Sequence, residues 1–443
     1  MSYALAIEKL GAMTPELHTK PGQPRRKFSL EEMRVLLGAL GDPHLRYPAV
    51  LIAGTNGKGS TASTLASILS AAEVRTGLYT SPHLSRINER IRIAGVEIGD
   101  EDFGRLYSLV EAAATGLVRD GHLAQPPSFF EFVTAMAFVH FAEAGVEMAV
   151  LEVGMGGRLD ATNVVEPLVS VVTDISLDHT EWLGSTIGAI AREKAGILRR
   201  NGTLVTLAQH PEANQALDEV ATELNVRGVN AGVYMPPTEV APGLGYTVEI
   251  FGEPVEVKSP LIGFHQQRNV ALAIAAAVEL RETHAIKLDA ASIGAGIRQT
   301  CWPGRLERIE RRGLTWVLDV AHNPAGAWAL RAGFNATFDG MSPRVLVFGC
   351  LRDKPVAEMA QILFSEFDRV IFAPINSPRA VAVEDLLVAA SSVGVDAEAA
   401  TSVEAALELA AQQGTGGVVV VSGSVYLVGA VRSVLFGGGG RQP

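Results

Sequence analysis

Short apolar runs alternate along the chain with longer segments of helical periodicity, and this alternation is the first feature that predicts a fold. The apolar runs that predict strands in the first part of the chain lie at 49–53, 77–80, 148–153, 168–173 and 203–207. The segments that predict helices begin near Lys58, Glu101, Phe129, Thr186 and Pro211. This pattern is typical of a parallel sheet covered by helices.

A glycine- and proline-rich stretch at 233–262, with alternating valines, predicts a small antiparallel insertion, and 269–280 predicts one apolar helix. The alternation restarts after Trp302-Pro303-Gly304. Strands are predicted near 315–320, 344–348, 369–373 and 417–422, with helices from Pro324, Pro355, Val383 and Val403. The Pro-Gly breaker favours a boundary there. We therefore expect an α/β protein with a P-loop-type domain at 1–302 and a smaller Rossmann-like α/β domain at 303–443, ending in a frayed GGGGRQP tail.

Composition narrows the class of protein. A chain of 443 residues is too long for one hydrophobic core. The net charge of −11, with both signs mixed along the chain, argues against a nucleic-acid or membrane surface. Cys301 and Cys350 form neither a disulfide framework nor a metal-ligand spacing. The first residues do not have the pattern of a signal peptide, and Glu131 and Glu143 interrupt the most apolar stretch, so we expect a cytoplasmic protein.

A glycine-rich loop follows the run at 49–53 and leads into a helix. Backbone N–H groups of such a loop, the helix N-terminus and a lysine together attract phosphate. The strict P-loop spelling fails because Gly59 follows Lys58 and the loop is shorter. A tight turn with an exposed lysine is the alternative. The nucleotide site predicted here comprises Thr55, Asn56, Gly57, Lys58, Gly59 and Ser60.

The spelling of this loop, GTNGKGS at 54–60, is similar to the phosphate loop of the Mur ligase superfamily. That superfamily includes folylpolyglutamate synthases and peptidoglycan-building amino-acid ligases. The resemblance implies ATP cleavage coupled to amide formation, rather than a hydrolase or a kinase.

Three further segments, at 79–91, 151–163 and 177–197, follow predicted strands and should surround the phosphate loop. They contain Ser81, Glu152 and His179, a donor set that suits Mg²⁺. Ser81 as a turn or cap residue and His179 as a hydrogen-bonded core residue are the alternatives for each alone. Glu152 ends an apolar strand, where a carboxylate is costly to bury without a partner.

These segments resemble the signature blocks of the dihydrofolate synthase/folylpolyglutamate synthase family, from about Leu45 to about Arg432. The resemblance implies that Ser81, Glu152 and His179 ligate magnesium. It also matches Lys194 with the family's lysine that CO₂ carboxylates, whereas a surface lysine is the alternative. A carbamate beside Mg²⁺ would be attractive where an ammonium would repel it.

The same resemblance assigns the remaining candidates. For the pterin it implies Ser128, Phe129, Phe130, Glu131, Leu159, Asp160 and Ala161, and for anionic carboxylates Arg86 and Arg90. For ATP it implies Asn269, Arg305 and Asp319, and for the incoming glutamate carboxylate His322, with Asn323 as a possible helix cap. The family spells the block at 318–324 with glycine where this chain has Val320.

The implied function is ATP-dependent ligation of L-glutamate to dihydropteroate, to reduced folates, or to both, by a monomeric enzyme. The assignment of Asp160 to the pterin site favours dihydropteroate as an acceptor. A folylpolyglutamate synthase only, a Mur-type peptidoglycan ligase and a catalytically silent nucleotide-binding regulator remain alternatives. The early phosphate loop leaves no separate domain for a UDP-sugar, which disfavours the peptidoglycan ligase.

Overall fold

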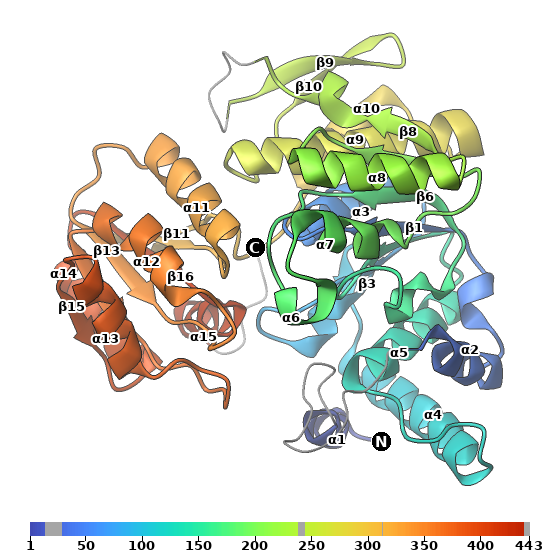
Figure 1. The fold of residues 1–443 in the computed structure, drawn as a ribbon, viewed down its shortest axis with the longest axis horizontal. Coiled ribbons are helices and arrows are strands. Elements are labelled where there is room, and N and C mark those ends of the chain that lie inside the picture. The colour runs from blue at the N-terminus through green and yellow to red at the C-terminus, as the bar shows by residue number, and fades with distance from the viewer. Residues whose placement is uncertain (14–28, 238–243, 312, 438–443) are drawn as a thin grey trace.

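The apolar runs form two separate sheets in the computed structural model, which describes residues 1–13, 29–237, 244–311 and 313–437. Figure 1 shows a larger N-terminal body, coloured blue to yellow, beside a smaller C-terminal body, coloured orange to red. The mixed α/β fold predicted from the sequence is confirmed. The division at 302/303 remains a prediction; the first strand of the second sheet begins at Glu307.

In the described residues, the N-terminal sheet has eight strands. Their order in space is β4 (Val96–Glu97), β3 (Ile91–Ile93), β2 (Thr76–Tyr79), β5 (Met148–Glu152), β1 (Ala49–Ala53), β6 (Pro167–Val172), β7 (Thr203–Thr206) and β8 (Arg227–Asn230). The pairings β2–β3 and β3–β4 are antiparallel, and the others are parallel. The carboxyl ends of β1, β2, β5 and β6 therefore lie at one edge.

Alternating side chains of β1 separate two cores, because successive residues of a strand point to opposite faces. Val50 packs with α3 (Lys58–Ala71), α9 (Phe264–His284) and α10 (Ala290–Gln299). Leu51 packs in the opposite core. The helices of that core are α1 (Tyr3–Ala12), α2 (Leu30–Ala39), α4 (Asp100–Arg119), α5 (Phe129–Glu143), α7 (Ile187–Ala195) and α8 (Pro211–Glu223).

Short elements complete this body. The predicted insertion is confirmed as an antiparallel hairpin of β9 (Tyr246–Ile250) and β10 (Glu253–Val257), although residues 238–243 of the predicted stretch lie outside the described residues. The remaining elements are α6 (Thr180–Leu183) and the 3₁₀ turns η1 (Pro43–Leu45), η2 (Ile87–Arg90), η3 (Ala161–Val164) and η4 (Ala231–Tyr234).

Six strands form the second sheet in the part of the chain that the structure describes. Their order is β11 (Glu307–Arg311), β12 (Leu314–Leu318), β16 (Val418–Ser422), β13 (Arg344–Phe348), β14 (Arg369–Phe372) and β15 (Ala397–Ala399). Only the β11–β12 pairing is antiparallel among these described strands. The helices around it are α11 (Pro324–Thr337), α12 (Val356–Leu363), α13 (Val383–Ser392), α14 (Val403–Gln413) and α15 (Val425–Phe436), with the turn η5 (Phe364–Glu366).

The elements that the apolar pattern did not predict are α1, α2, α6, α10, α15, β3, β4, β8, β11 and β15. The missed strands are short, lie at or near sheet edges and carry polar residues, so they lack a continuous apolar run. The predicted frayed tail falls at 438–443, outside the described residues, except for Gly437. In the described ranges, no helix has the length and apolar character needed to cross a membrane.

Candidate active site

The phosphate loop lies between β1 and α3, and two contacts explain its glycines. Gly57 has φ +90°, and a Cβ there would lie 2.1 Å from the Asn269 side-chain oxygen. Gly54 has φ +149°, and a Cβ there would lie 1.8 Å from the Thr173 hydroxyl. Nζ of Lys58 donates to the carbonyls of Gly54 and Thr55, each at 3.1 Å. The loop is thus held tightly, with its lysine folded over its own backbone.

A pocket of about 330 Å³ lies over this loop and brings together candidates from both bodies. From the N-terminal body it is lined by the loop 54–60 and by Ser81, Glu152, His179, Lys194 and Asn269. From the C-terminal part it is lined by Arg305, Asp319 and His322. Every residue that the sequence assigned to ATP, to the metal or to catalysis therefore lies at one pocket.

The three candidate metal ligands come from the carboxyl ends of neighbouring strands. The buried Glu152 carboxylate accepts the Ser81 N–H at 3.0 Å, and burial raises its pKa although Lys58 opposes the shift. His179 has φ +50°, an uncommon conformation for a residue with a side chain, and burial lowers its pKa to about 4. Its imidazole is thus neutral at pH 7, the form that ligates metals. Among the described residues no three His, Cys, Asp or Glu side chains cluster as a metal site, so this set depends on the Ser81 oxygen.

Lys194 is a buried residue of α7, and this excludes the surface-lysine alternative. Its Nζ donates to the Gly54 carbonyl at 2.6 Å. Burial, together with the nearby charge of Lys58, lowers its pKa to about 7. A substantial fraction of the amine is therefore unprotonated near neutral pH.

Two of the residues assigned to ATP, Asp319 and Arg305, line the pocket and also form hydrogen bonds with the backbone around it. The buried Asp319 carboxylate accepts the backbone N–H groups of Leu306 and Ala321 at 2.9 and 2.8 Å. Burial lowers the pKa of Arg305, although Asp319 and Glu152 raise it, and its guanidinium donates to the Gly304 carbonyl. The half-buried Arg305 guanidinium, held by one backbone bond, is available for an anion.

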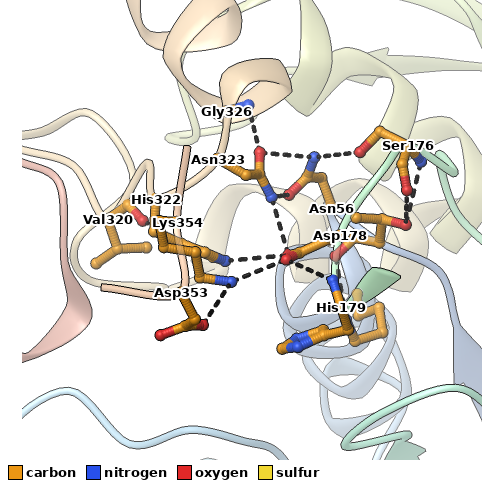
Figure 2. A network of polar contacts seen from close by, with 12 residues as sticks. Asn56, Ser176, Asp178, His179, Val320, His322, Asn323, Gly326, Asp353 and Lys354 are labelled. Atoms are coloured by element: carbon orange, nitrogen blue, oxygen red, sulfur yellow. Dashed lines mark hydrogen bonds and ion pairs between the residues drawn. The ribbon is translucent and has the colours of Figure 1, made fainter. Parts of the chain in front are cut away.

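A polar network joins the two bodies across the pocket (Figure 2). Asp178 lies at its centre, 2.8 Å from Lys354 Nζ and 3.7 Å from His322 Nε2. Asn323 donates to Asp178 at 3.2 Å and to the Asn56 side-chain oxygen at 3.1 Å. Burial alone would raise the pKa of Asp178, but His322, His179 and Lys354 hold it well below its usual range.

Asp178 and Lys354 are site residues that sequence reasoning did not assign. Lys354 follows β13 in the loop before α12, and the carboxyl-end rule for parallel strands would have indicated it. Asp178 directly precedes His179, and its position after a strand end is the signal that indicates it. Asn323 caps α11 by accepting the Gly326 N–H at 2.8 Å, as expected.

We predict that Lys354→Met loosens the contact between the bodies. The Lys354 and Asp178 side chains are only 7% and 10% exposed, and removing one partner of a buried pair costs about 3–5 kcal/mol. Small-angle X-ray scattering of the variant should give a larger radius of gyration than wild type. Lys258→Met, at an exposed lysine, is the matched control. A scattering profile identical to wild type would contradict this role.

A second cavity of about 120 Å³ contains part of the pterin set, namely Glu131, Leu159, Asp160 and Ala161. Phe130 is buried and packs beside Tyr79, so its contact with a pterin remains a prediction. Phe129 instead lies under the Arg90 guanidinium, 5.1 Å from it. Ser128 caps α5, accepting the Glu131 N–H, while Glu131 accepts the Ser128 N–H at 2.7 Å.

The Asp160 carboxylate accepts hydrogen bonds from its own loop, which the sequence did not predict. Its buried carboxylate accepts the Thr162 N–H at 3.0 Å, the Thr162 hydroxyl at 2.6 Å and the Met155 N–H at 3.0 Å. The side chain therefore holds its own loop in place, and any contact with a ligand is additional.

The two candidate arginines have partners outside the main pocket. Arg86 is half-exposed and pairs with Asp100 at 2.6 Å. Arg90 is buried, and its Nε donates to His83 Nδ1 at 2.9 Å. Neither arginine lines the pocket over the phosphate loop, although the charge of Arg90 acts to lower the pKa of Glu152.

Comparison with known proteins agrees with this geometry. The Mur ligase middle domain matches residues 52–277, and the Mur ligase, glutamate ligase domain matches residues 304–425. A Bacillus subtilis dihydrofolate synthase/folylpolyglutamate synthase is 33% identical over 414 residues, covering 92% of this chain and 95% of that protein. Mycobacterium tuberculosis folylpolyglutamate synthase, solved with ADP and AMPPCP, has 34% identity and a TM-score of 0.84, covering 94% of this chain and 96% of that one.

Escherichia coli FolC, solved in complex with DHPP and ADP, has 32% identity and a TM-score of 0.83, covering 98% of this chain and 97% of that one. These relatives match nearly the whole chain, and their names agree with the family predicted from the signature blocks. The chain belongs to the dihydrofolate synthase/folylpolyglutamate synthase family of Mur ligases.

Proposed function

We propose that this protein is an ATP-dependent ligase that joins L-glutamate to dihydropteroate and to reduced folates. The observation that carries the proposal is the single pocket in which Lys58, Glu152, Lys194, Arg305 and His322 meet. The relatives with these names, and the solved neighbours with adenine nucleotides or DHPP, support the same reading. We also propose that it acts as a monomer in the cytoplasm.

The proposed chemistry has two steps. A carboxylate oxygen of the acceptor attacks the γ-phosphorus of ATP, giving an acyl phosphate and ADP. The amine of glutamate then attacks the acyl carbon, the tetrahedral intermediate expels phosphate, and the amine loses a proton. Lys58 and Arg305 stabilise the charge on the transferred phosphoryl group, because positioning and electrostatics dominate this transfer. His322 holds the carboxylate of the incoming glutamate.

Mg²⁺ is the cofactor that the donor set fits best. Glu152 supplies a buried carboxylate with a single hydrogen bond from Ser81 N–H, and His179 supplies a neutral imidazole. Ser81, Glu152 and His179 would hold the ion, and it would neutralise charge on the nucleotide phosphates. The contacts between the two bodies exclude water from the acyl phosphate.

Lys194 is predicted to be carboxylated by CO₂. Its amine is buried, and its pKa of about 7 leaves the nucleophilic neutral form populated. Carbon NMR of protein supplied with labelled bicarbonate should show one carbamate carbonyl signal, absent in Lys194→Ala. The signal should grow as pH rises through about 7, because only the unprotonated amine reacts. A spectrum without a signal that depends on Lys194 would contradict the modification.

Product analysis tests the proposed function. Purified protein is given labelled glutamate, ATP and Mg²⁺ with either dihydropteroate or tetrahydrofolate, and the products are separated by chromatography. We expect a glutamylated product and ADP from each acceptor. If tetrahydrofolate gives product and dihydropteroate does not, the protein is a folylpolyglutamate synthase without dihydrofolate synthase activity. If neither acceptor gives product or ADP, a peptidoglycan-type ligase or a silent nucleotide-binding protein would be favoured.

Asp160→Ala is predicted to reduce use of dihydropteroate more than it reduces extension of a glutamylated folate. Losing a buried hydrogen-bond acceptor costs about 1–3 kcal/mol, so the kcat/KM for dihydropteroate should fall about tenfold or more. Dihydropteroate has no glutamyl tail, so it has fewer other contacts with the protein to compensate for the lost hydrogen bond. The ratio of kcat/KM values for the two acceptors measures this selectivity.

Thr162→Val is the control for that experiment, because it removes only the hydroxyl bond that Asp160 accepts from its own loop. An equal change of the ratio in both variants would mean that Asp160 acts by positioning the loop. An unchanged ratio in Asp160→Ala would remove Asp160 from pterin recognition.

A further inference from the structure

A larger cavity of about 710 Å³ adjoins the reaction pocket and has no role in the chemistry described so far. It lies between the antiparallel edge of the N-terminal sheet, at β3 and β4, and α15 of the C-terminal body. Pro82 and Arg305 line both cavities. The bodies touch at its wall, where the Ser85 hydroxyl lies 3.5 Å from the Gly429 carbonyl. Figure 1 shows α15 on the side of the C-terminal body that faces the N-terminal one.

The lining of this cavity is positively charged, in contrast to the whole chain with its net charge of −11. The charged residues that line it are Arg86, Arg92, Arg305, Arg432, Glu89 and Glu97. The Glu89 carboxylate is already occupied by the backbone N–H groups of Leu84, Ser85 and Arg86. Arg86 already pairs with Asp100 at 2.6 Å, and Arg432 pairs with Glu307 at 3.1 Å. The cavity therefore attracts an anion chiefly through Arg305 and the weakly paired Arg92.

Arg92 gives the most specific sign of a ligand. Its side chain is 10% exposed, and its buried Nε has no hydrogen-bond partner among the described residues. Its Nη2 reaches Glu97 only at 3.4 Å, and its guanidinium lies 5.8 Å from the centre of the Trp302 ring. A buried donor without a partner is costly, and because Nε is shielded from the cavity, a bound carboxylate would meet the guanidinium at its Nη groups.

The chemistry of the proposed function supplies a polyanionic ligand. Each residue of a glutamyl chain uses one of its two carboxyl groups in the amide and keeps the other free. The acceptor also lengthens at every turnover, while its terminal carboxylate must return to the same point beside Lys58. The earlier residues of the tail therefore need a cationic space that opens from the reaction pocket.

We propose that this cavity holds the glutamyl tail of an already extended folate acceptor. The proposal rests on the proposed function and adds the site that selects acceptors by tail length. Arg92 binds a free carboxylate, and Arg432, whose Nε is held by Glu307, adds to the attraction. Trp302 and Phe436 contact the methylene groups of the tail. Glu97 opposes binding, because its carboxylate lies beside Arg92 at the same wall.

Steady-state kinetics with dihydropteroate and with a triglutamylated reduced folate tests this site. For Arg92→Gln, the KM for the triglutamylated acceptor should rise about tenfold more than the KM for dihydropteroate, as expected for a lost charge-assisted hydrogen bond. Arg432→Gln should change the ratio in the same direction. Glu97→Gln should change it in the opposite direction, because it removes a like charge. Arg308→Gln, at an exposed arginine of β11 outside the cavity, is the matched control and should leave the ratio unchanged.

Equal KM changes for both acceptors in the Arg92 and Arg432 variants, with no change in Glu97→Gln, would overturn the tail site. A rise confined to the KM for free glutamate would also overturn it, since the cavity would then hold the incoming amino acid. Wild-type protein that ligates glutamate to dihydropteroate but cannot extend a glutamylated folate would refute the tail site alone. Wild-type protein that uses neither acceptor would refute the proposed function and the tail site together.

Discussion

Glu152→Gln is expected to abolish ligation and, at the same time, to raise the thermal stability of the metal-free protein. Glu152 is a buried carboxylate, and among the described residues it accepts a hydrogen bond from the Ser81 N–H. A buried charge with so little compensation destabilises the folded state. Glutamine keeps the shape and the hydrogen bond but removes the charge that the proposed metal needs, so kcat should fall more than about 100-fold.

The stability effect has a defined pH dependence. Burial raises the pKa of Glu152, although Lys58, the Ser81 N–H and Arg305 act in the opposite direction. A carboxyl group with a raised pKa in the folded state loses stability as pH rises above its unfolded pKa. The difference in Tm between variant and wild type, measured in chelator, should therefore be larger at about pH 8 than at about pH 4. A variant that is active, or inactive because it is unfolded, would contradict this account of Glu152.

Lys58→Ala should reduce kcat by roughly 100- to 1000-fold, the loss typical of removing one group that stabilises transition-state charge. Among the described residues, Nζ of Lys58 donates to the carbonyls of Gly54 and Thr55 in its own loop, so the fold should survive its removal. Circular dichroism and Tm check the fold, and single-turnover ADP formation measures the chemical step. Lys258→Ala is the control for loss of an exposed lysine.

The Lys58 variant has a second consequence, at Lys194. The charge of Lys58 helps to lower the pKa of Lys194, so the variant should shift the appearance of the carbamate signal to higher pH. ADP formation at the wild-type rate would remove Lys58 from phosphoryl transfer.

The sequence predicted those parts of the fold whose pattern is local. The apolar run at 49–53 predicts a strand, the glycines after it predict a turn, and the segment from Lys58 predicts a helix. The structure has the strand and the helix at those residues. The short edge strands β3 and β4 were missed because pairing with β2, a contact between distant segments, defines them. The cavity beside them was therefore also invisible in the sequence.

The sequence predicted the site residues that follow strand ends of the N-terminal sheet. It did not predict contacts that depend on packing between distant segments. Lys194 gave no local signal of burial, yet the structure buries it against Gly54. Lys354 reaches Asp178 across 176 positions of sequence, and no periodicity encodes that contact. The burial of Phe130 beside Tyr79 is likewise set by the packing of α5 and not by residue type, so the sequence did not predict it.

Transfer of an oxygen atom from acceptor to phosphate tests the central claim most directly. Dihydropteroate with a heavy-oxygen label in its carboxylate is incubated with the enzyme, ATP, Mg²⁺ and glutamate, and the released phosphate is examined by mass spectrometry. If an acyl phosphate forms in the pocket of Lys58, Glu152 and Arg305, one labelled oxygen must appear in each phosphate. Ligated product accompanied by unlabelled phosphate would contradict the acyl-phosphate route.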